Sequence, residues 1–157
     1  MKNTLLAIGK TNQAWLEEAV SEYVKRIKKY ITFELKIIPD VKNAKSLSED
    51  QLKQKEGELL LASLLDADEL VLFDENGQEY TSEGFAAFLE KKMLTSVKSL
   101  VFCIGGAYGF SGDVYKRAIA KIALSQMTFS HQMVRLIATE QLYRAFSIIK
   151  NEPYHHK

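Results

Sequence analysis

A glycine-rich segment carries the clearest chemical signal in this sequence. Residues 105–112 read GGAYGFSG and directly follow the apolar run SLVFCI at residues 99–104, which predicts a buried strand. Glycine lets a ligand approach the backbone closely, and parallel α/β sheets bind ligands beyond the carboxyl ends of their strands. The segment therefore predicts a ligand-binding loop that begins at Gly105, and a tight turn without a ligand is the alternative.

The spacing of these glycines argues against two familiar nucleotide motifs. Gly106 follows Gly105 at once and Gly109 comes next, so the segment does not match G-x-G-x-x-G. No lysine follows Gly112, which argues against a Walker loop. A second turn signal, DENG at residues 74–77, follows a predicted strand, and two such turns favour a ligand site.

Other classes of chemistry lack the residues that they need. His131 and the pair His155-His156 have no cysteine or carboxylate at metal-ligand spacing, and H-E-x-x-H is absent, so no metal is predicted. Cys103 lies in an apolar run, which predicts a small buried side chain rather than a nucleophile. No serine lies in a G-x-S-x-G motif, so no serine nucleophile of a hydrolase triad is predicted.

Residues 131–149 predict a long helix that is apolar around most of its circumference. Such a helix is buried on all sides or lies at an interface, and we expect a homodimer whose seam includes it. Glu140 and Arg144 are four residues apart. They form an ion pair within the helix, or Arg144 reaches across the dimer seam toward an anionic substrate.

The composition predicts one globular domain over residues 1–157, because 46% of the residues are apolar and 26% are charged. The net charge is only +1, so a nucleic-acid partner must be held by local patches rather than by a general basic field. The cluster Lys25, Arg26, Lys28 and Lys29 is such a patch, or it compensates the dipole of the helix that it ends.

The expected cellular location is the cytoplasm. The single cysteine allows no internal disulfide and fits a reducing compartment. The apolar run near the N-terminus is too short for a signal segment or a membrane span, so no membrane partner is expected.

Strand and helix patterns alternate along the chain, which predicts an α/β fold with a mostly parallel sheet and flanking helices. A polar loop is expected at residues 41–50, and Asn12 and Ser48 are expected to cap the first two helices. The predicted strands are residues 4–8, 31–38, 69–73, 99–104 and 122–125, and the predicted helices begin after Asn12 and cover 49–65, 82–93, 113–120 and 131–149.

Five segments, in chain order, carry a resemblance that spans essentially the whole chain: LLAIGK, LFDENGQEYTSEGFA, FCIGGAYGFSGDV, ALSQMTFSHQMVRLIATEQLYRAF and NEPYHHK. They contain IGGxxG, LSxxTxxHxxxR, EQLYRA and PYH in this order, which together are highly specific. In these segments the chain resembles the RlmH family, the SPOUT-class methyltransferases that methylate N3 of a pseudouridine in 23S ribosomal RNA.

The resemblance implies a trefoil-knotted α/β domain, bound S-adenosylmethionine and an obligate homodimer that acts on ribosomal RNA, with the ribosome as partner. General topology rules alone would have rejected the knot. Ser130 departs from the family pattern, which usually has a proline before the histidine, and Phe73 stands where leucine is commoner. By the family pattern, three loops form the cofactor pocket with Phe73, Gly105, Leu124, Ser125, Gln126, Met127, Thr128 and Phe129.

The candidates for catalysis are Arg144, Tyr154 and His155. N3 of a pseudouridine is nucleophilic only after it loses its proton, so the enzyme must position the base and favour its anion. Arg144 would stabilise that anion or hold a phosphate, and Tyr154 or His155 would grip the base or accept its proton. The PYH match favours these roles over a frayed terminus, and we expect Tyr154 and His155 to fold back over the cofactor pocket.

Two other functions remain open at this point. The chain could be a dimeric module that holds a nucleotide or RNA without catalysis, or a SPOUT enzyme that acts on transfer RNA. The small size leaves no room for a separate RNA-binding domain, which favours a large preformed ribosomal surface as the substrate.

Overall fold

Five parallel strands form one sheet with the order β2-β1-β4-β3-β5 in a computed structural model that describes residues 1–156. This arrangement confirms the predicted α/β class with a parallel sheet and flanking helices. The strands are β1 (Lys2–Ile8), β2 (Thr32–Ile38), β3 (Glu69–Glu79), β4 (Ser99–Ile104) and β5 (Ala120–Ala123).

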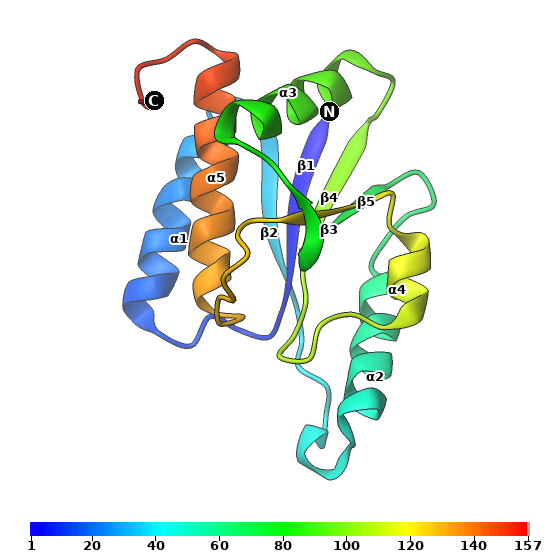
Figure 1. The fold of residues 1–157 in the computed structure, drawn as a ribbon. Helices are drawn as coiled ribbons and strands as arrows, with labels where there is room; N and C mark the ends of the chain where they lie inside the picture. Colours follow the sequence, from blue (N-terminus) through cyan, green and yellow to red (C-terminus); the bar gives the residue numbers. More distant parts are fainter. Residues whose placement is uncertain (157) are drawn as a thin grey trace.

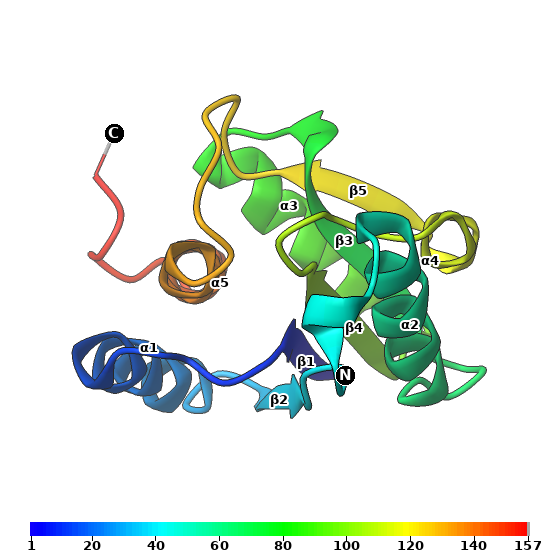
Figure 2. The same cartoon turned by 90° about the horizontal axis from the view of Figure 1, so that it is seen from below.

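Helices cover both faces of the sheet (Figures 1 and 2). On one face lie α1 (Ala14–Ile27), α3 (Ser82–Leu94) and α5 (Met133–Ile149), and α5 packs against both of the others. On the other face lie α2 (Glu49–Ala62) and α4 (Gly112–Arg117), and a short 3-10 turn (Ala44–Ser46) precedes α2.

Alternating side chains of the central strands supply two separate cores. In β4, Leu100, Phe102 and Ile104 face the side covered by α1, α3 and α5, whereas Val101 and Cys103 face α2 and α4. All five side chains are buried. Cys103 is therefore a buried apolar residue, as predicted, and burial raises the pKa of its thiol.

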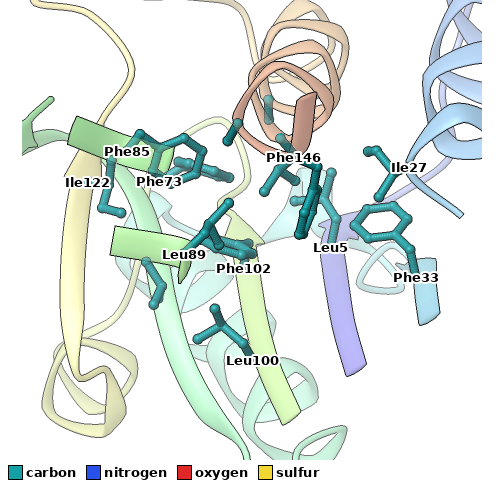
Figure 3. Packing of buried hydrophobic residues seen from close by; sticks show 14 of the residues in the cluster. Leu5, Ile27, Phe33, Phe73, Phe85, Leu89, Leu100, Phe102, Ile122 and Phe146 are labelled. Carbon is teal, nitrogen blue, oxygen red and sulfur yellow. The ribbon is translucent and has the colours of Figure 1, made fainter. Parts of the chain in front are cut away.

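The larger core is rich in phenylalanine (Figure 3). The rings of Phe73 and Phe102 stack with centroids 5.4 Å apart, and Phe85 of α3 meets Phe102 edge to face at 6.1 Å. Phe146 of α5 packs into the same cluster. Each of these rings contributes about 1.5–3 kcal/mol through burial, so α3 and α5 are held firmly on this face.

The structure confirms one of the two predicted helix caps and contradicts the other. Ser48 caps α2 as predicted, since its hydroxyl accepts a hydrogen bond from the Gln51 amide at 3.2 Å and the Gln51 side chain accepts one from the Ser48 amide at 3.0 Å. The Asn12 cap is wrong. Helix α1 begins after Gln13, which makes no side-chain cap bond, and the Asn12 amide instead donates to Oε1 of Gln132.

Strand β3 does not end at the predicted turn. It continues to Glu79, and its pairing with β5 shifts register between Phe73 and Gln78. Gly77 makes this possible, because a Cβ atom there would lie 2.6 Å from the Ile122 backbone nitrogen. Residues 74–77 therefore form an irregular segment within the strand, at the carboxyl end of its first half.

The chain between β4 and α5 also differs slightly from the prediction. Helix α4 ends at Arg117, and β5 begins at Ala120 rather than at residue 122. The Ile119 amide donates to the Leu70 carbonyl, which brings the chain into the sheet early. Pairing with β3 therefore overrides the helix pattern of residues 118–120.

Candidate functional site

The irregular segment within β3 and the loops that follow β4 and β5 surround a cavity of about 500 Å³. The lining includes residues 73–76 from the irregular part of β3, residues 104–110 from the glycine loop and residues 124–131 apart from Gln126. Tyr115 of α4 and Val134 of α5 complete it. The sheet thus brings together three segments that lie far apart in the sequence.

Most of the predicted cofactor residues meet at this cavity. Phe73, Gly105, Leu124, Ser125, Met127, Thr128 and Phe129 all line it. Gln126 belongs to the same loop but is not among the lining residues. The side chain of Ser125 accepts a hydrogen bond from the Met127 amide at 3.0 Å, which makes a local turn around Gln126.

The glycine loop turns tightly at the edge of the cavity. The Gly109 amide donates to the Gly106 carbonyl at 3.2 Å, and Gly109 has a φ of +82°, a conformation that favours glycine. At Gly105 the constraint is the lack of space for a side chain. A Cβ atom there would lie 3.3 Å from the Phe110 ring and from the Gly109 backbone. The backbone is therefore exposed to a ligand on a rigid turn.

Two hydrogen bonds tie the β3 loop to its neighbours. The hydroxyl of Tyr115 donates to Oδ2 of Asp74, and the hydroxyl of Thr128 donates to Oε2 of Glu75 at 2.8 Å. Burial raises the pKa of Tyr115, and the bond to Asp74 raises it further. These bonds join the β3 segment to α4 and to the loop after β5, and the rim of the cavity carries two carboxylates.

Arg135, the arginine that ends the motif LSxxTxxHxxxR, lies in this region, and the sequence analysis predicted no role for it. Its guanidinium is almost fully buried and donates to the carbonyls of Ile8 at 2.7 Å and Gly9 at 2.8 Å. It also donates to the Thr11 hydroxyl and to the His131 carbonyl. Burial lowers its pKa. Arg135 therefore fastens the start of α5, and with it the loop before α5, to the end of β1.

Glu56 of α2 is a second residue that sequence reasoning missed. Its carboxyl group is buried, its Oε2 has no hydrogen-bond partner within residues 1–156, and it lies against Gly106. Burial raises the pKa of Glu56, and the charge of Asp40 raises it further. A signal was present in both cases: Glu56 precedes the buried Leu60 by four residues, and Arg135 precedes the buried Ala138 by three, so each charge lies on an apolar stripe.

The predicted catalytic residues form a separate cluster on the outer side of α5. The guanidinium of Arg144 donates to Oε1 of Glu140, with Nη2 at 2.5 Å, which confirms the ion pair within the helix. This bond raises the pKa of Arg144. Nδ1 of His155 lies 3.3 Å from Nη1 of Arg144, and its Nε2 lies 3.2 Å from Oε1 of Glu83. We call Glu140, Arg144, Tyr154 and His155 the tail cluster.

Tyr154 is packed firmly into the tail cluster. Its hydroxyl donates to Oε1 of Glu140 at 3.1 Å and lies 3.3 Å from the Tyr23 hydroxyl. Its ring meets Tyr143 edge to face at 4.6 Å, and the Arg144 guanidinium lies over it at 4.8 Å. Burial raises the pKa of Tyr154, as do its bonds to Tyr23 and Glu140.

The tail does not cover the cavity of its own chain, contrary to our expectation. The chain turns at Asn151, which has a φ of 55°, and folds back onto α5 (Figure 1). Tyr154 and His155 then contact α1, α3 and α5, and neither is among the cavity-lining residues. Polar partners on those helices, such as Glu83 and Glu140, determine this position.

Two further classes of site are not found in the described part of the chain. Among residues 1–156, no group of three His, Cys, Asp or Glu side chains is placed to hold a metal ion. No helix in the same range is long and apolar enough to cross a membrane.

Comparisons with known proteins agree with this architecture. A family described as "Predicted SPOUT methyltransferase" matches residues 1–155. Two curated relatives, from Flavobacterium psychrophilum and Parabacteroides distasonis, are 57% and 58% identical over 157 residues, which is the full length of both partners in each comparison. Both carry the name "Ribosomal RNA large subunit methyltransferase H".

A solved structure shares the fold. It is the "putative methyltransferase Lpg2936" from Legionella pneumophila in complex with S-adenosylmethionine, with a TM-score of 0.50 and 10% sequence identity. The match covers 92% of this chain and 66% of that one.

Proposed function

The chain belongs to the SPOUT methyltransferase family, and on that premise we propose that it transfers a methyl group from S-adenosylmethionine to large-subunit ribosomal RNA. The target is N3 of a pseudouridine, and the substrate is the assembled ribosome in the cytoplasm. The observation that carries the proposal is the convergence of three loops, far apart in sequence, on one cavity at the carboxyl ends of the strands. Full-length relatives that carry the methyltransferase name support it.

The residues around the cavity fit S-adenosylmethionine. A volume of about 500 Å³ lies within the usual range of about 300–1,000 Å³ for small-molecule sites. The rim carries Asp74 and Glu75, which suit a ligand with cationic sulfonium and ammonium groups. The backbone at Phe73 and Gly105, with residues 124–129, would hold the cofactor.

The cofactor supplies an electrophilic methyl group, so the task of the protein is to hold the base and to remove its proton. His155 is the proton acceptor that we favour, because a neutral imidazole has a ring nitrogen that can accept a proton. Burial raises the pKa of Tyr154, so its phenol keeps its proton and acts as a hydrogen-bond donor. Arg144 stays cationic beside Glu140 and stabilises the anion of the base.

A homodimer would bring these groups to a cavity. Within one chain the tail cluster and the cavity lie along different parts of α5, since Val134 lines the cavity and Arg144 lies ten residues further on, about 15 Å along the helix axis. The exposed face near the start of α5 is apolar, with Met133 at 37% and Trp15 of α1 at 57% exposure. Pairing across this surface would set the tail cluster of one chain at the cavity of its partner.

Methyl transfer to ribosomes tests the activity directly. Purified protein with labelled S-adenosylmethionine should methylate ribosomes from cells that lack it and leave free transfer RNA unlabelled. Nucleoside mass analysis of the ribosomal RNA should then find a methylated pseudouridine. Label in transfer RNA alone would favour the other enzyme class, and no label in either would favour a binding module.

The proposed cofactor position has its own test. Gly105→Val should abolish S-adenosylmethionine binding in calorimetry, because its side chain would crowd the Phe110 ring and block the backbone. Sedimentation should find the same homodimer for the wild type and the variant. Retained affinity in the variant would contradict the pocket, and a folded wild-type monomer at micromolar concentration would contradict the dimer.

A further inference from the structure

We propose that a basic hollow at the carboxyl ends of α1 and α5 binds phosphates of the RNA substrate, an inference that deepens the proposed function and rests on it. The hollow has a volume of about 430 Å³ and is separate from the cofactor cavity. Both helices end on the same side of the molecule (Figure 1). The lining residues are Arg26, Lys29, Tyr30, Tyr143, Lys150 and Glu152.

Positive charge is concentrated around this hollow although the whole chain has a net charge of only +1. Three cations line it, Arg26, Lys29 and Lys150, against one lining carboxylate, Glu152. Within residues 1–156, neither Lys29 nor Lys150 forms an ion pair. Lys25 and Lys28 lie beside Arg26 and Lys29 in the sequence.

Helix dipoles do not account for this number of cations. Each helix end is equivalent to about half an elementary charge, so the ends of α1 and α5 together balance about one cation. Lys25 and Arg26, in the last turn of α1, already exceed that amount. The remaining lysines repel one another unless an external anion lies between them.

Arg26 is held ready for an anion. Its Nε donates to Oε1 of Glu22 at 3.3 Å, while its Nη1 and Nη2 have no hydrogen-bond partner within residues 1–156. The guanidinium lies over the rings of Tyr23 and Tyr143 at 5.4 and 5.6 Å. Stacking restricts the motion of the guanidinium, so its unpartnered Nη1 and Nη2 groups can bind a phosphate at a lower entropic cost.

Aromatic rings form the floor of the hollow. Tyr30 packs against Phe146 and Tyr143, with centroids 6.1 and 6.0 Å apart. The Tyr30 hydroxyl donates a hydrogen bond to the Glu152 carboxylate, so this negative charge already has a partner within the protein. A cleft with cations at its rim and apolar walls strengthens the local field toward a polyanion.

The position of the hollow suits RNA that also reaches the tail cluster. Tyr143 lines the hollow and contacts the ring of Tyr154. An RNA strand that runs through the hollow would therefore pass the proposed catalytic groups. Phosphates carry one negative charge per nucleotide, which matches a row of unpaired cations better than a single small anion would.

Two lysines at the rim give the sharpest test. Lys29→Gln with Lys150→Gln removes two charges from the hollow, and Lys55→Gln with Lys91→Gln removes two exposed lysines from α2 and α3 as a matched control. The probe is large ribosomal subunits from cells that lack this protein, titrated at several salt concentrations. Methyl-transfer kinetics and calorimetry with S-adenosylmethionine accompany the binding assay.

The hollow variant should bind subunits about tenfold more weakly, and its log-log salt slope should fall by roughly 2, one for each lost phosphate contact. KM for subunits should rise while kcat and cofactor affinity stay unchanged. The control should behave as the wild type. Equal binding by all three proteins, or equal losses in both double variants, would overturn the proposal, as would a changed oligomeric state in the hollow variant.

Failure of the proposed function would look different. A wild-type protein that binds subunits but transfers no methyl group would contradict the enzymatic activity, and the salt titration would still test the hollow. A wild-type protein that methylates subunits while the hollow variant keeps the same KM and salt slope would contradict the hollow alone.

Discussion

The carboxyl group of Glu56 lies so close to Gly106 that a Cβ atom on that glycine would be 2.1 Å from Oε2. Gly106 does not have a positive φ, so a side chain at this position is opposed by the contact with Glu56 rather than by backbone conformation. The glycine loop at the cavity therefore rests on a buried acid from α2, on the opposite face of the sheet from α5.

Substitution of Gly106 should therefore disturb the cofactor loop. Gly106→Ala must displace either the loop or Glu56, and we expect S-adenosylmethionine affinity to fall at least tenfold, about 1.4 kcal/mol. Adding Glu56→Ala should restore part of the affinity because it removes the clash. Gly112→Ala is the control, since a Cβ atom there meets nothing within 4 Å. Calorimetry on the four proteins checks this, and an unaffected Gly106→Ala variant would contradict it.

Glu56 should also make stability depend on pH. Its pKa is raised in the folded protein, so its favourable contribution is present below the unfolded pKa and is lost as the pH rises through the folded pKa. Glu56→Gln has no such charge. It should be more stable than the wild type at pH 8 by about 1–3 kcal/mol, because the wild-type carboxylate carries a charge without a partner whereas the buried amide is neutral.

Denaturant unfolding of the two proteins between pH 4 and pH 8 measures this difference. The advantage of Glu56→Gln should shrink as the pH falls toward 4, where the wild-type carboxyl is protonated as well. A difference that stays constant over this range would show that ionisation of Glu56 is not its cause.

Arg135 should be important for stability rather than for substrate binding. Arg135→Met removes four hydrogen bonds and leaves the carbonyls of Ile8 and Gly9 without this partner, so we expect a loss on the order of 2–4 kcal/mol. Arg117→Met is the comparison, because Arg117 also donates to two carbonyls but is half-buried. Equal melting temperatures for the two variants would contradict the role of Arg135.

Removal of the tail should separate cofactor binding from turnover. Deletion of residues 154–157 leaves all cavity-lining residues in place, so S-adenosylmethionine affinity should be nearly unchanged. Methyl transfer to ribosomes should fall by about a hundredfold or more, the scale of lost acid–base catalysis and positioning. Full activity in the truncated protein would contradict a catalytic role for these residues.

Single substitutions divide this effect between the two side chains. Tyr154→Phe keeps the ring on Tyr143 and loses the hydrogen bond to Glu140, so its effect should be smaller than that of the deletion. His155→Ala removes the proposed proton acceptor and should reduce kcat at neutral pH. A higher pH, which favours the substrate anion, should partly restore that loss, whereas a purely structural role would not respond to pH in this way.

The sequence by itself determined the elements and their order. Apolar runs such as residues 99–104 indicated buried strands, the capping residue Ser48 marked a helix start, and the glycines after β4 indicated a ligand loop. These signals are local, because they depend on residues that are neighbours in the chain. Turn signals had indicated the segments at residues 74–77 and 105–112, and the family motifs added the third loop, residues 124–129, which no local pattern would have grouped with them.

Only the tertiary structure decided which distant groups meet. The pairing of β3 with β5 continued the strand through a predicted turn, and packing across the sheet set Glu56 of α2 against Gly106. Polar partners on α3 and α5 drew His155 away from the cavity of its own chain. Such contacts depend on the register and twist of the whole sheet, and no short stretch of sequence encodes the long-range packing energies that choose among them.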